Sequence, residues 1–264
     1  MPSTDPGAGP NDDTADLRLG DELAELLHHG GFPGAIGGHD QGAGRDGYRA
    51  AADDLPGHGE PEDGRLCGTA PRGRPDLLDS VADWRSAATP MGPFRLVPVR
   101  LDRDLRLVAR WMNDPAVAAF WDLDGPESAT ETHLRAQLDG DGRSVPCLGV
   151  LAGVPMSYWE VYRADLDPLA RHYPARPHDT GLHLVIGRVT DRGRGIGSML
   201  LRAVADLVMD HRPSCGRVVA EPDLRNVPSV AAFLTAGFRL SAELDLPDRR
   251  AALMVRDRAL RELL

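Results

Sequence analysis

The pattern of hydrophobic and polar positions changes near residue 93. From there on, stretches in which apolar and polar residues alternate, as in half-buried strands, are separated by stretches in which apolar residues recur every three or four positions, as on one face of a helix. The pattern predicts, in chain order, a strand over 94–99, a helix over 101–112, a weaker helix over 131–138, strands over 145–151, 154–162 and 182–187, a helix over 196–208, a strand over 217–220, a helix between 228 and 237, and strands over 238–246 and 251–255. Because strands and helices are interspersed, we predict an α/β fold, a mixed sheet with helices on its faces.

Two interruptions separate these elements. Pro115 follows the first predicted helix and is interpreted as its stop signal. Residues 163–180 form a predicted loop with three prolines, and loops of this length are usually functional or disordered.

The first 90 residues differ in composition from the rest. They hold 17 Asp and Glu against seven Arg, whereas residues 91–264 hold 23 of each, so the net charge of −10 belongs to the N-terminal third. Only 12 of these 90 residues are Leu, Ile, Val or Phe, and so little apolar surface does not offset the entropy of ordering a chain. We therefore predict a largely disordered acidic tail over 1–90 and one folded domain over 91–264. Transient helices over 17–29 and 77–84 fit the tail; in an alternative interpretation residues 76–88 dock on the domain.

The composition excludes several classes of protein. All 30 basic residues are Arg, so the chain has no lysine for a nucleotide-binding P-loop, a Schiff base or pyridoxal phosphate. No apolar run reaches the length of about 18–20 residues that a membrane span needs. The sequence also lacks the stripe of basic residues that is typical of nucleic-acid-binding proteins. We also expect no secretory signal after Met1. Together these features favour a cytoplasmic protein.

The cysteines and histidines show no metal-site pattern. Cys67, Cys147 and Cys215 are widely spaced and odd in number, which favours reduced thiols over a disulfide framework. Cys147 and Cys215 are interpreted as buried thiols and not as nucleophiles. Since His172 and His178 lack the spacing of metal ligands, we expect no metal and no permanently bound cofactor.

A glycine-rich loop lies between a predicted strand and the strongest predicted helix. Glycines allow the backbone to approach a ligand, the first N–H groups of a helix are unpaired, and two arginines add positive charge. We therefore predict an anion site, although a plain helix-entry turn uses the same glycines. The loop lies too late in the chain for a Rossmann site, and a Walker loop would need Lys. Its residues are Arg192, Gly193, Arg194, Gly195, Ile196 and Gly197.

This loop and its helix resemble the acyl-CoA pyrophosphate loop of the GNAT N-acyltransferase superfamily. The segment from Asn226 to Phe238 resembles the next helix and strand of that fold. Shorter segments resemble the siderophore-biosynthesis branch, at 111–115 with Phe120-Trp121, at 181–183 and at 222–226. The resemblance covers about residues 92–258. It implies a mostly antiparallel sheet with splayed central strands, and acyl-CoA or an acyl carrier protein as the acyl donor.

The resemblance also implies where the donor binds. The pantetheine arm would run along the predicted strand 182–187, beside Leu184, Val185 and Ile186. A backbone N–H at the splay, that of Leu184 or Val185, would polarise the thioester carbonyl as an oxyanion hole does. Asn226 is interpreted as a helix cap and as a contact to CoA.

A catalytic pair is expected for the acceptor amine. A lysine amine has a pKa of about 10.4, so its neutral form costs about 4–5 kcal/mol at pH 7 and a proton acceptor is needed. By resemblance, Asp223 takes the proton and His183 holds the acceptor. Taken alone, His183 also fits an ordinary strand position, and Asp223 a turn or a helix cap. Trp121 is a candidate pocket residue, and so is Trp111, although its place beside a helix stripe favours core packing.

The resemblance therefore implies an N-acyltransferase of siderophore assembly (mycobactin or hydroxamate type) that acylates the N6 amine of lysine or N6-hydroxylysine. One departure is Phe233, which stands where many GNAT enzymes have a tyrosine general acid and which cannot donate a proton. This departure weighs against one alternative, an acetyltransferase of another small amine such as an aminoglycoside. The other alternative is an acyl-CoA-binding module without catalysis.

Overall fold

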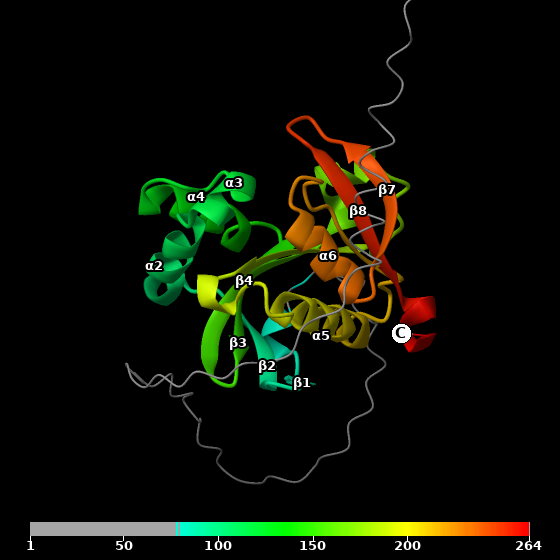
Figure 1. Cartoon of the computed structure of the whole chain (residues 1–264), viewed down its shortest axis with the longest axis horizontal. Coiled ribbons are helices and arrows are strands. Elements are labelled where there is room, and N and C mark those ends of the chain that lie inside the picture. The colour runs from blue at the N-terminus through cyan, green and yellow to red at the C-terminus, as the bar shows by residue number, and fades with distance from the viewer. Residues whose placement is uncertain (1–77, 79, 264) are drawn as a thin grey trace, which may run out of the picture. The chain divides into compact units, whose positions relative to one another are not determined.

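The computed structural model of the chain describes residue 78 and residues 80–263 (Figure 1). The predictions for residues 1–77, including the helix over 17–29 and the state of Cys67, lie outside the described residues. Within the described part of the chain, no helix is both long and apolar enough to cross a membrane.

An eight-stranded sheet carries the described fold, with the strand order β1-β2-β3-β4-β5-β6-β8-β7. All neighbouring strands are antiparallel except β5 and β6, which run parallel. The predicted α/β fold with a mixed, mostly antiparallel sheet is therefore confirmed. The strands are β1 (Ala87–Thr89), β2 (Gly92–Pro98), β3 (Ser144–Leu151), β4 (Val154–Arg163), β5 (Thr180–Ile186), β6 (Arg217–Ala220), β7 (Arg239–Asp245) and β8 (Arg250–Asp257).

The two parallel strands separate soon after they meet. Pairing between β5 and β6 is restricted to Thr180 with Val218 and Gly181 with Val219. β5 then continues to Ile186 while paired on its other side with β4. The central strands therefore splay as predicted, and the edge of β5 beyond Gly181 has no strand partner on the β6 side.

Five α-helices are present among the described residues, one more than the pattern predicts. The additional helix, α3, begins at Pro115, which starts a helix instead of only ending one. Asp114 caps α3 by accepting the N–H of Ala116 at 3.0 Å, and proline suits a first helical position because its missing N–H is not needed there. The α-helices are α2 (Leu101–Met112), α3 (Pro115–Trp121), α4 (Glu127–Leu138), α5 (Ile196–His211) and α6 (Val227–Thr235), and the 3-10 helices are η1 (Val81–Asp83), η2 (Ala164–Leu166), η3 (Pro168–Arg171), η4 (Val189–Asp191) and η5 (Arg258–Leu263).

Helices cover both faces of the sheet. On one face, Tyr158 of β4 and Val185 of β5 belong to a hydrophobic cluster with side chains of α2 and α4. On the other face, Ile186 packs toward the start of α5, where its Cγ1 lies 3.9 Å from the position of a Cβ on Gly197. Figure 1 shows α5 and α6 lying together on this second face. Because successive strand side chains point to opposite faces, His183 lies on the face of α2 and α4.

The described fold begins earlier than the predicted start at Phe94. Leu78, Val81 and Trp84 are buried, and the ring of Trp84 stacks on that of His211 in α5 with centroids 5.4 Å apart. β1 pairs with β2, so this segment also extends the sheet. The alternative interpretation, in which residues 76–88 dock on the domain, therefore agrees with the contacts of the described residues from Leu78 on. Composition averaged over 90 residues hides this, because three apolar side chains are enough to anchor a short segment.

The predicted loop over 163–180 is ordered and contains η2 and η3. Its C-terminal end is fixed by a buried ion pair between Asp179 and Arg217 of β6. The guanidinium of Arg217 also lies over the ring of Tyr173, 5.7 Å from its centroid. At the other end, Arg163 and Asp165 form a second shielded ion pair at 2.8 Å. The segment is therefore held as a fixed wall beside β4 and β5.

Candidate active site

The backbone of β5 directs two N–H groups into the splay. The N–H of Gly187 donates to the carbonyl of Met156, 2.9 Å away on the β4 side. Because antiparallel pairing alternates, the N–H of Val185 also points to β4, whereas those of Leu184 and Ile186 point to the β6 side. Leu184 and Ile186 therefore remain the candidates to contact an acyl donor. Val185 does not offer its N–H there, and its side chain is buried in the core.

The glycine loop has the geometry of an anion site. Gly193 and Gly195 have φ values of 68° and 75°, in the left-handed region that favours glycine. α5 begins directly after Gly195, and the N–H of Met199 donates to the carbonyl of Gly195 at 3.1 Å. The N–H groups of residues 196–198 are therefore not used within the helix and are directed outward from its end. Such a helix end favours a phosphate group.

The two arginines of this loop have different surroundings. The guanidinium of Arg192 donates to the carbonyls of Ile186 (2.9 Å) and Gly187 (3.0 Å), and to the carboxylate of Asp114 (2.9 Å). Arg194, in contrast, is exposed. The positive charge predicted for the loop is therefore that of Arg194, because Asp114 neutralises the charge of Arg192.

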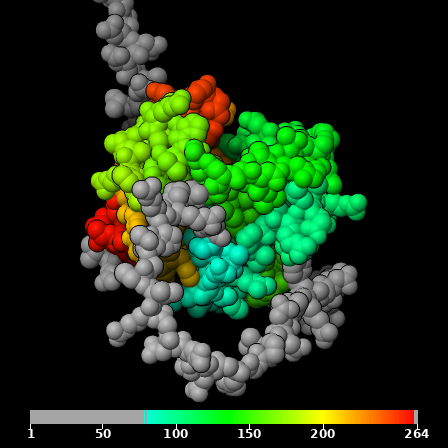
Figure 2. Space-filling view, turned by 180° about the vertical axis from the view of Figure 1, so that it is seen from behind, coloured from blue at the N-terminus to red at the C-terminus, as the bar shows by residue number. Residues whose placement is uncertain are grey.

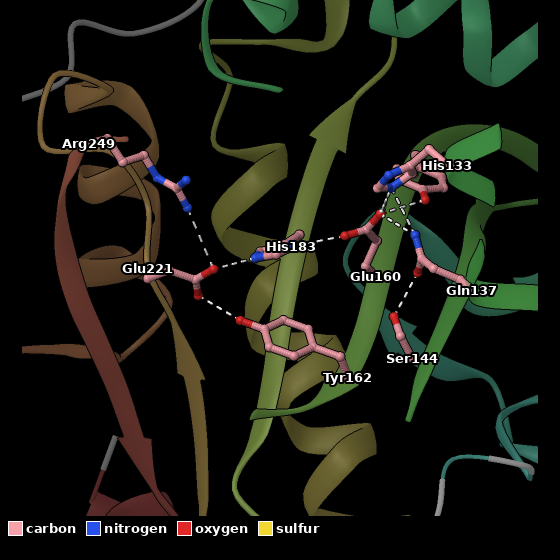
Figure 3. Close-up of polar contacts among 9 residues, drawn as sticks. His133, Gln137, Ser144, Glu160, Tyr162, His183, Glu221 and Arg249 are labelled. Carbon is pink, nitrogen blue, oxygen red and sulfur yellow. Dashed lines mark hydrogen bonds and ion pairs between the residues drawn. The ribbon is translucent and has the colours of Figure 1, made fainter. Parts of the chain in front are cut away.

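The imidazole of His183 lies between two glutamates (Figure 3). Its Nδ1 is 2.8 Å from Oε2 of Glu160 on β4, and its Nε2 is 2.6 Å from Oε1 of Glu221, which follows β6. Burial opposes a charged imidazole, but the two carboxylates outweigh burial and raise the pKa of His183 to about 10. His183 is therefore an imidazolium at neutral pH, and both ring nitrogens donate. It bridges β4 and the end of β6 where the splay begins.

Glu160 is held by side chains from two elements. Its Oε1 lies 2.6 Å from Nε2 of His133 on α4 and accepts hydrogen bonds from Gln137 (2.7 Å) and from the hydroxyl of Tyr158 (2.9 Å). Burial alone would raise the pKa of Glu160, but the hydrogen bonds from His133 and His183 lower it well below the usual value. Glu160 is therefore a fixed carboxylate that orients the Nδ1 side of His183.

Glu221, and not Asp223, contacts His183. Glu221 also accepts a hydrogen bond from the hydroxyl of Tyr162 at 2.7 Å; burial opposes its charge, but the imidazolium holds its pKa below the usual value. The carboxylate of Asp223 accepts hydrogen bonds from the backbone and the guanidinium of Arg225, both at 2.7 Å, and these lower its pKa. Asp223 continues the extended chain in a bridge to β8, so it lies beyond Glu221 on the same side of the chain.

The two candidate tryptophans occupy different places. The ring of Trp121, at the end of α3, meets the imidazole of His183 edge-on, with centroids 5.8 Å apart. Trp111 is buried, and its ring covers Gly187 so closely that a Cβ there would lie 2.2 Å from it. Trp121 therefore remains a candidate to contact the acceptor, whereas Trp111 is a core residue that fixes the end of β5.

A pocket of about 420 Å³ opens beside His183. It lies between α4, the start of β3, β4 and the segment with η2 and η3; Figure 2 shows that segment in yellow-green beside the green part of the chain. Leu166 and Pro168 contribute apolar surface, and Arg143 and Asp167 contribute opposite charges. Burial and the neighbouring glutamates raise the pKa of Asp167. Arg163 lines the pocket as well, paired with Asp165. The pocket therefore combines an acidic inner end, apolar walls and charged side chains of both signs.

A comparison with known families identifies the chain. A family model described as an acetyltransferase (GNAT) domain matches residues 100–246. The chain belongs to this GNAT family. The matched range includes His183, both of its glutamates and the glycine loop, so the whole site described above lies within the GNAT domain.

Two curated relatives indicate the branch of the family. Lysine N-acyltransferase MbtK from Mycolicibacterium paratuberculosis is 40% identical over 189 residues, which cover 71% of this chain and 85% of that protein. N(6)-hydroxylysine O-acetyltransferase from Escherichia coli is 34% identical over 155 residues, which cover 59% of this chain and 49% of that protein. The resemblance to the siderophore-biosynthesis branch is confirmed. This GNAT chain is an acyl-CoA-dependent N-acyltransferase.

Solved structures share the GNAT fold. An uncharacterised protein from Bacillus halodurans superposes with a TM-score of 0.63 at 32% identity, covering 67% of this chain and 92% of that one. The aminoglycoside acetyltransferase AAC(6')-Ib in complex with coenzyme A gives a TM-score of 0.55 at 22% identity, covering 64% of this chain and 96% of that one. The second likeness is one of fold alone.

Two further residues that the sequence indicated for this GNAT domain are the N-cap of α6 and a residue within that helix. Asn226 caps the helix, since its side chain accepts the N–H of Ser229 at 3.3 Å, and a contact to CoA stays a prediction. Phe233 is buried and packs edge-on against Phe238, with centroids 5.1 Å apart. A side chain with no acidic proton in a packed position cannot protonate a leaving thiolate.

Cys147 and Cys215 lie in surroundings that disfavour a nucleophilic thiolate. Cys147 and Cys215 are buried, and burial raises the pKa of both thiols, which disfavours the reactive thiolate. Among residues 80–263, no group of three or more His, Cys, Asp or Glu side chains is arranged to hold a metal ion.

Three residues of the site were not predicted from the sequence: Glu160, Glu221 and His133. Glu221 had a local signal, because it directly precedes the segment 222–226 and directly follows a strand. Glu160 had none, because it faces His183 only through the register of β4 with β5, across the ordered segment between them. His133 joins the site from α4, a helix whose position on the sheet no local pattern reveals.

Proposed function

We propose that this GNAT enzyme transfers an acyl group from acyl-CoA, or from an acyl carrier protein, to the N6 amine of lysine or N6-hydroxylysine during siderophore assembly in the cytoplasm. The observation that carries the proposal is the imidazolium of His183, held by Glu160 and Glu221 at the point where β5 and β6 part. On one side of it lie the donor-facing N–H groups of β5, and on the other the pocket of about 420 Å³.

The charges of the site assign roles to its residues. With a pKa of about 10, His183 is already protonated at neutral pH and is unsuited to accept a proton. We therefore give His183 the role of a positioning residue, whose two N–H groups hold Glu160 and Glu221 in place beside the acceptor, and Glu221 the role that the sequence suggested for Asp223. The amine attacks the thioester in its neutral form. As the N–C bond forms, the nitrogen becomes acidic enough to pass a proton to the carboxylate of Glu221, and the C–S bond then breaks, so that the donor leaves as a thiolate.

The donor side supplies stabilisation of the developing negative charge. The N–H of Leu184 points into the splay, where a thioester carbonyl would lie next to it. Removing one such donor typically costs about 100-fold or more in rate. The diphosphate of the donor would rest on the N–H groups of residues 196–198, with Arg194 at the rim.

The pocket suits an amino acid with a long side chain. Its inner end, at His183 and Glu160, would take the reacting amine, and the apolar walls of Leu166 and Pro168 would cover the methylene groups. Asp167 and Arg143 carry the charges that complement the ammonium and the carboxylate of the amino acid.

The proposal is tested by a panel of acceptors with acyl-CoA as the donor. Lysine, N6-hydroxylysine, ornithine and kanamycin are compared by release of free thiol, and mass spectrometry locates the new acyl group. We expect N6-acyl product with lysine or N6-hydroxylysine, a loss of at least about 100-fold for His183→Ala, and little change for the matched control His172→Ala, whose side chain is exposed. Acylation of kanamycin alone, or binding of CoA without thiol release from any acceptor, would contradict the proposal.

A further inference from the structure

Arg192 joins the donor side of the splay to a helix on the acceptor side. Its guanidinium donates to both carbonyls at the end of β5, those of Ile186 and Gly187, and its third contact is Oδ1 of Asp114 at 2.9 Å. The side chains of Arg192 and Asp114 are only 24% and 19% exposed, so water competes little for this ion pair. A side chain fixed by three partners is not available to wrap around an incoming diphosphate.

Asp114 has two functions at the start of α3. The Oδ1 that contacts Arg192 also accepts the N–H of Ala116 at 3.0 Å and so caps the helix. The hydrogen bond from Arg192 holds the pKa of Asp114 below its usual value, so the carboxylate is charged at neutral pH. Substitution can separate the two functions, because asparagine caps a helix about as well as aspartate but carries no charge.

Apart from its cap, α3 is anchored at Val117 and at Trp121, whose ring meets that of Tyr158 edge-on with centroids 5.7 Å apart. Val117 is its one buried residue, and the loop after it is tied to the preceding helix by Asn113, whose side chain accepts the N–H of Gly125 at 2.9 Å. The helix ends at Trp121, whose ring touches the imidazole of His183. A displacement at the start of α3 therefore moves Trp121 relative to His183.

We propose that the ion pair of Arg192 with Asp114 is a positioning link, which fixes α3 and Trp121 beside the acceptor site, and that Arg192 does not bind the diphosphate of the donor. The inference rests on the proposed function only for the identity of the acceptor. It assigns the two arginines of one loop to different substrates: Arg192 acts through α3 on the acceptor, and Arg194 acts on the donor.

The test compares the KM for acyl-CoA with the KM for the acceptor in Arg192→Gln, Asp114→Asn and the matched control Arg194→Gln. Since a misplacement of about 1 Å can cost about 100-fold, we expect the first two variants to raise the acceptor KM about 10-fold and to leave the donor KM within about two-fold. Arg194→Gln is expected to raise the donor KM only. Arg192→Lys should recover part of the loss, because an ammonium restores one contact to Asp114.

Two results would overturn the inference: a higher donor KM with an unchanged acceptor KM in Arg192→Gln, or no change of either KM in both variants. If Arg192→Gln does not fold, Asp114→Asn decides, because it keeps the cap.

If the native chain acylates neither lysine nor N6-hydroxylysine, the proposed function fails on its own. The inference is then decided by two measurements that compare Arg192→Gln with the native chain. These are the Kd of coenzyme A and the fluorescence of Trp121, which is obtained by difference from Trp121→Phe. We expect an unchanged Kd and altered Trp121 emission; a raised Kd with unaltered emission overturns it.

Discussion

The donor side and the acceptor side of the splay are built in opposite ways. The donor side is one continuous segment, from the end of β5 through the glycine loop into α5, and it works mainly through backbone N–H groups. The acceptor side is assembled from β4, β5, the end of β6, α3 and α4, and it works through side chains that meet only in the folded chain. The residues that bind a common donor can therefore lie close together in the sequence, whereas the groups that select and activate the acceptor are brought together by tertiary contacts.

The largest expected effect comes from a substitution that disrupts the acceptor side alone. Glu160→Gln keeps an acceptor oxygen but removes the charge that helps to hold His183 as an imidazolium. We expect kcat to fall about 100-fold while the donor KM stays unchanged, because Glu160 contacts neither the loop nor the donor edge of β5. Steady-state kinetics check this, with Glu131→Gln as the matched control, a half-buried residue of α4 that pairs with Arg135 and not with the site. A donor KM that rises in parallel would show that the two sides are not separable.

A second prediction concerns the pH dependence of stability. The pKa of His183 is raised from 6.5 to about 10 on folding, so the charged site stabilises the fold fully below about pH 6.5, and this contribution is lost as the pH rises through about 10. We expect the difference in Tm between the native chain and His183→Gln to be largest near about pH 6 and to shrink toward about pH 10. Thermal unfolding followed by circular dichroism measures it. A difference that grows with pH would contradict the assigned charge.

A third prediction breaks the donor side alone. Because Gly195 has a φ of 75°, Gly195→Ala is expected to lower the free energy of unfolding by about 1 kcal/mol and to raise the donor KM several-fold. The acceptor KM should not change. Gly197→Ala is the control for stability, since its new Cβ would make only ordinary contacts, at 3.9 and 4.0 Å, with Ile186 and Ala232. Denaturant unfolding and kinetics of both variants check the prediction; equal losses of stability would be evidence against a special backbone at Gly195.

The smallest expected effect concerns ionic strength. Arg194 is exposed, so its attraction for a diphosphate is screened by salt, with a Debye length of about 10 Å at 0.1 M. We expect the donor KM of the native chain to rise about two-fold between low and high salt, and that of Arg194→Gln to rise less. Donor titrations at two salt concentrations measure this. The same salt dependence in both proteins would remove Arg194 from the donor site.

The amino-acid sequence predicts those parts of this enzyme whose physical cause is local. Alternation and helical spacing correctly located every strand except β1, and the main helices. The glycines before Ile196 marked the turn into α5, because positive φ and unpaired N–H groups arise within a few residues. Pro115 predicted only the end of a helix, although a proline that ends one helix also fits the first turn of the next.

The contacts of the acceptor side lay beyond such patterns. His183 and Glu160 are neighbours through strand register, and a strand alternates in the same way whatever faces it. The choice between Glu221 and Asp223 also depends on register, because both side chains lie on one side of the same extended segment. The sequence predicted Arg192 as a phosphate ligand. Its actual partner, Asp114, is far from it in the sequence, and no local pattern indicates their contact.

The most direct test of the central claim compares Glu221→Gln with Asp223→Asn in acyl transfer to lysine and N6-hydroxylysine. Glu221 touches His183, whereas Asp223 is occupied by Arg225. The measured quantity is kcat/KM for the acceptor at saturating acyl-CoA. We predict a loss of at least about 100-fold for Glu221→Gln and of less than about five-fold for Asp223→Asn. The reverse order of losses would contradict the account.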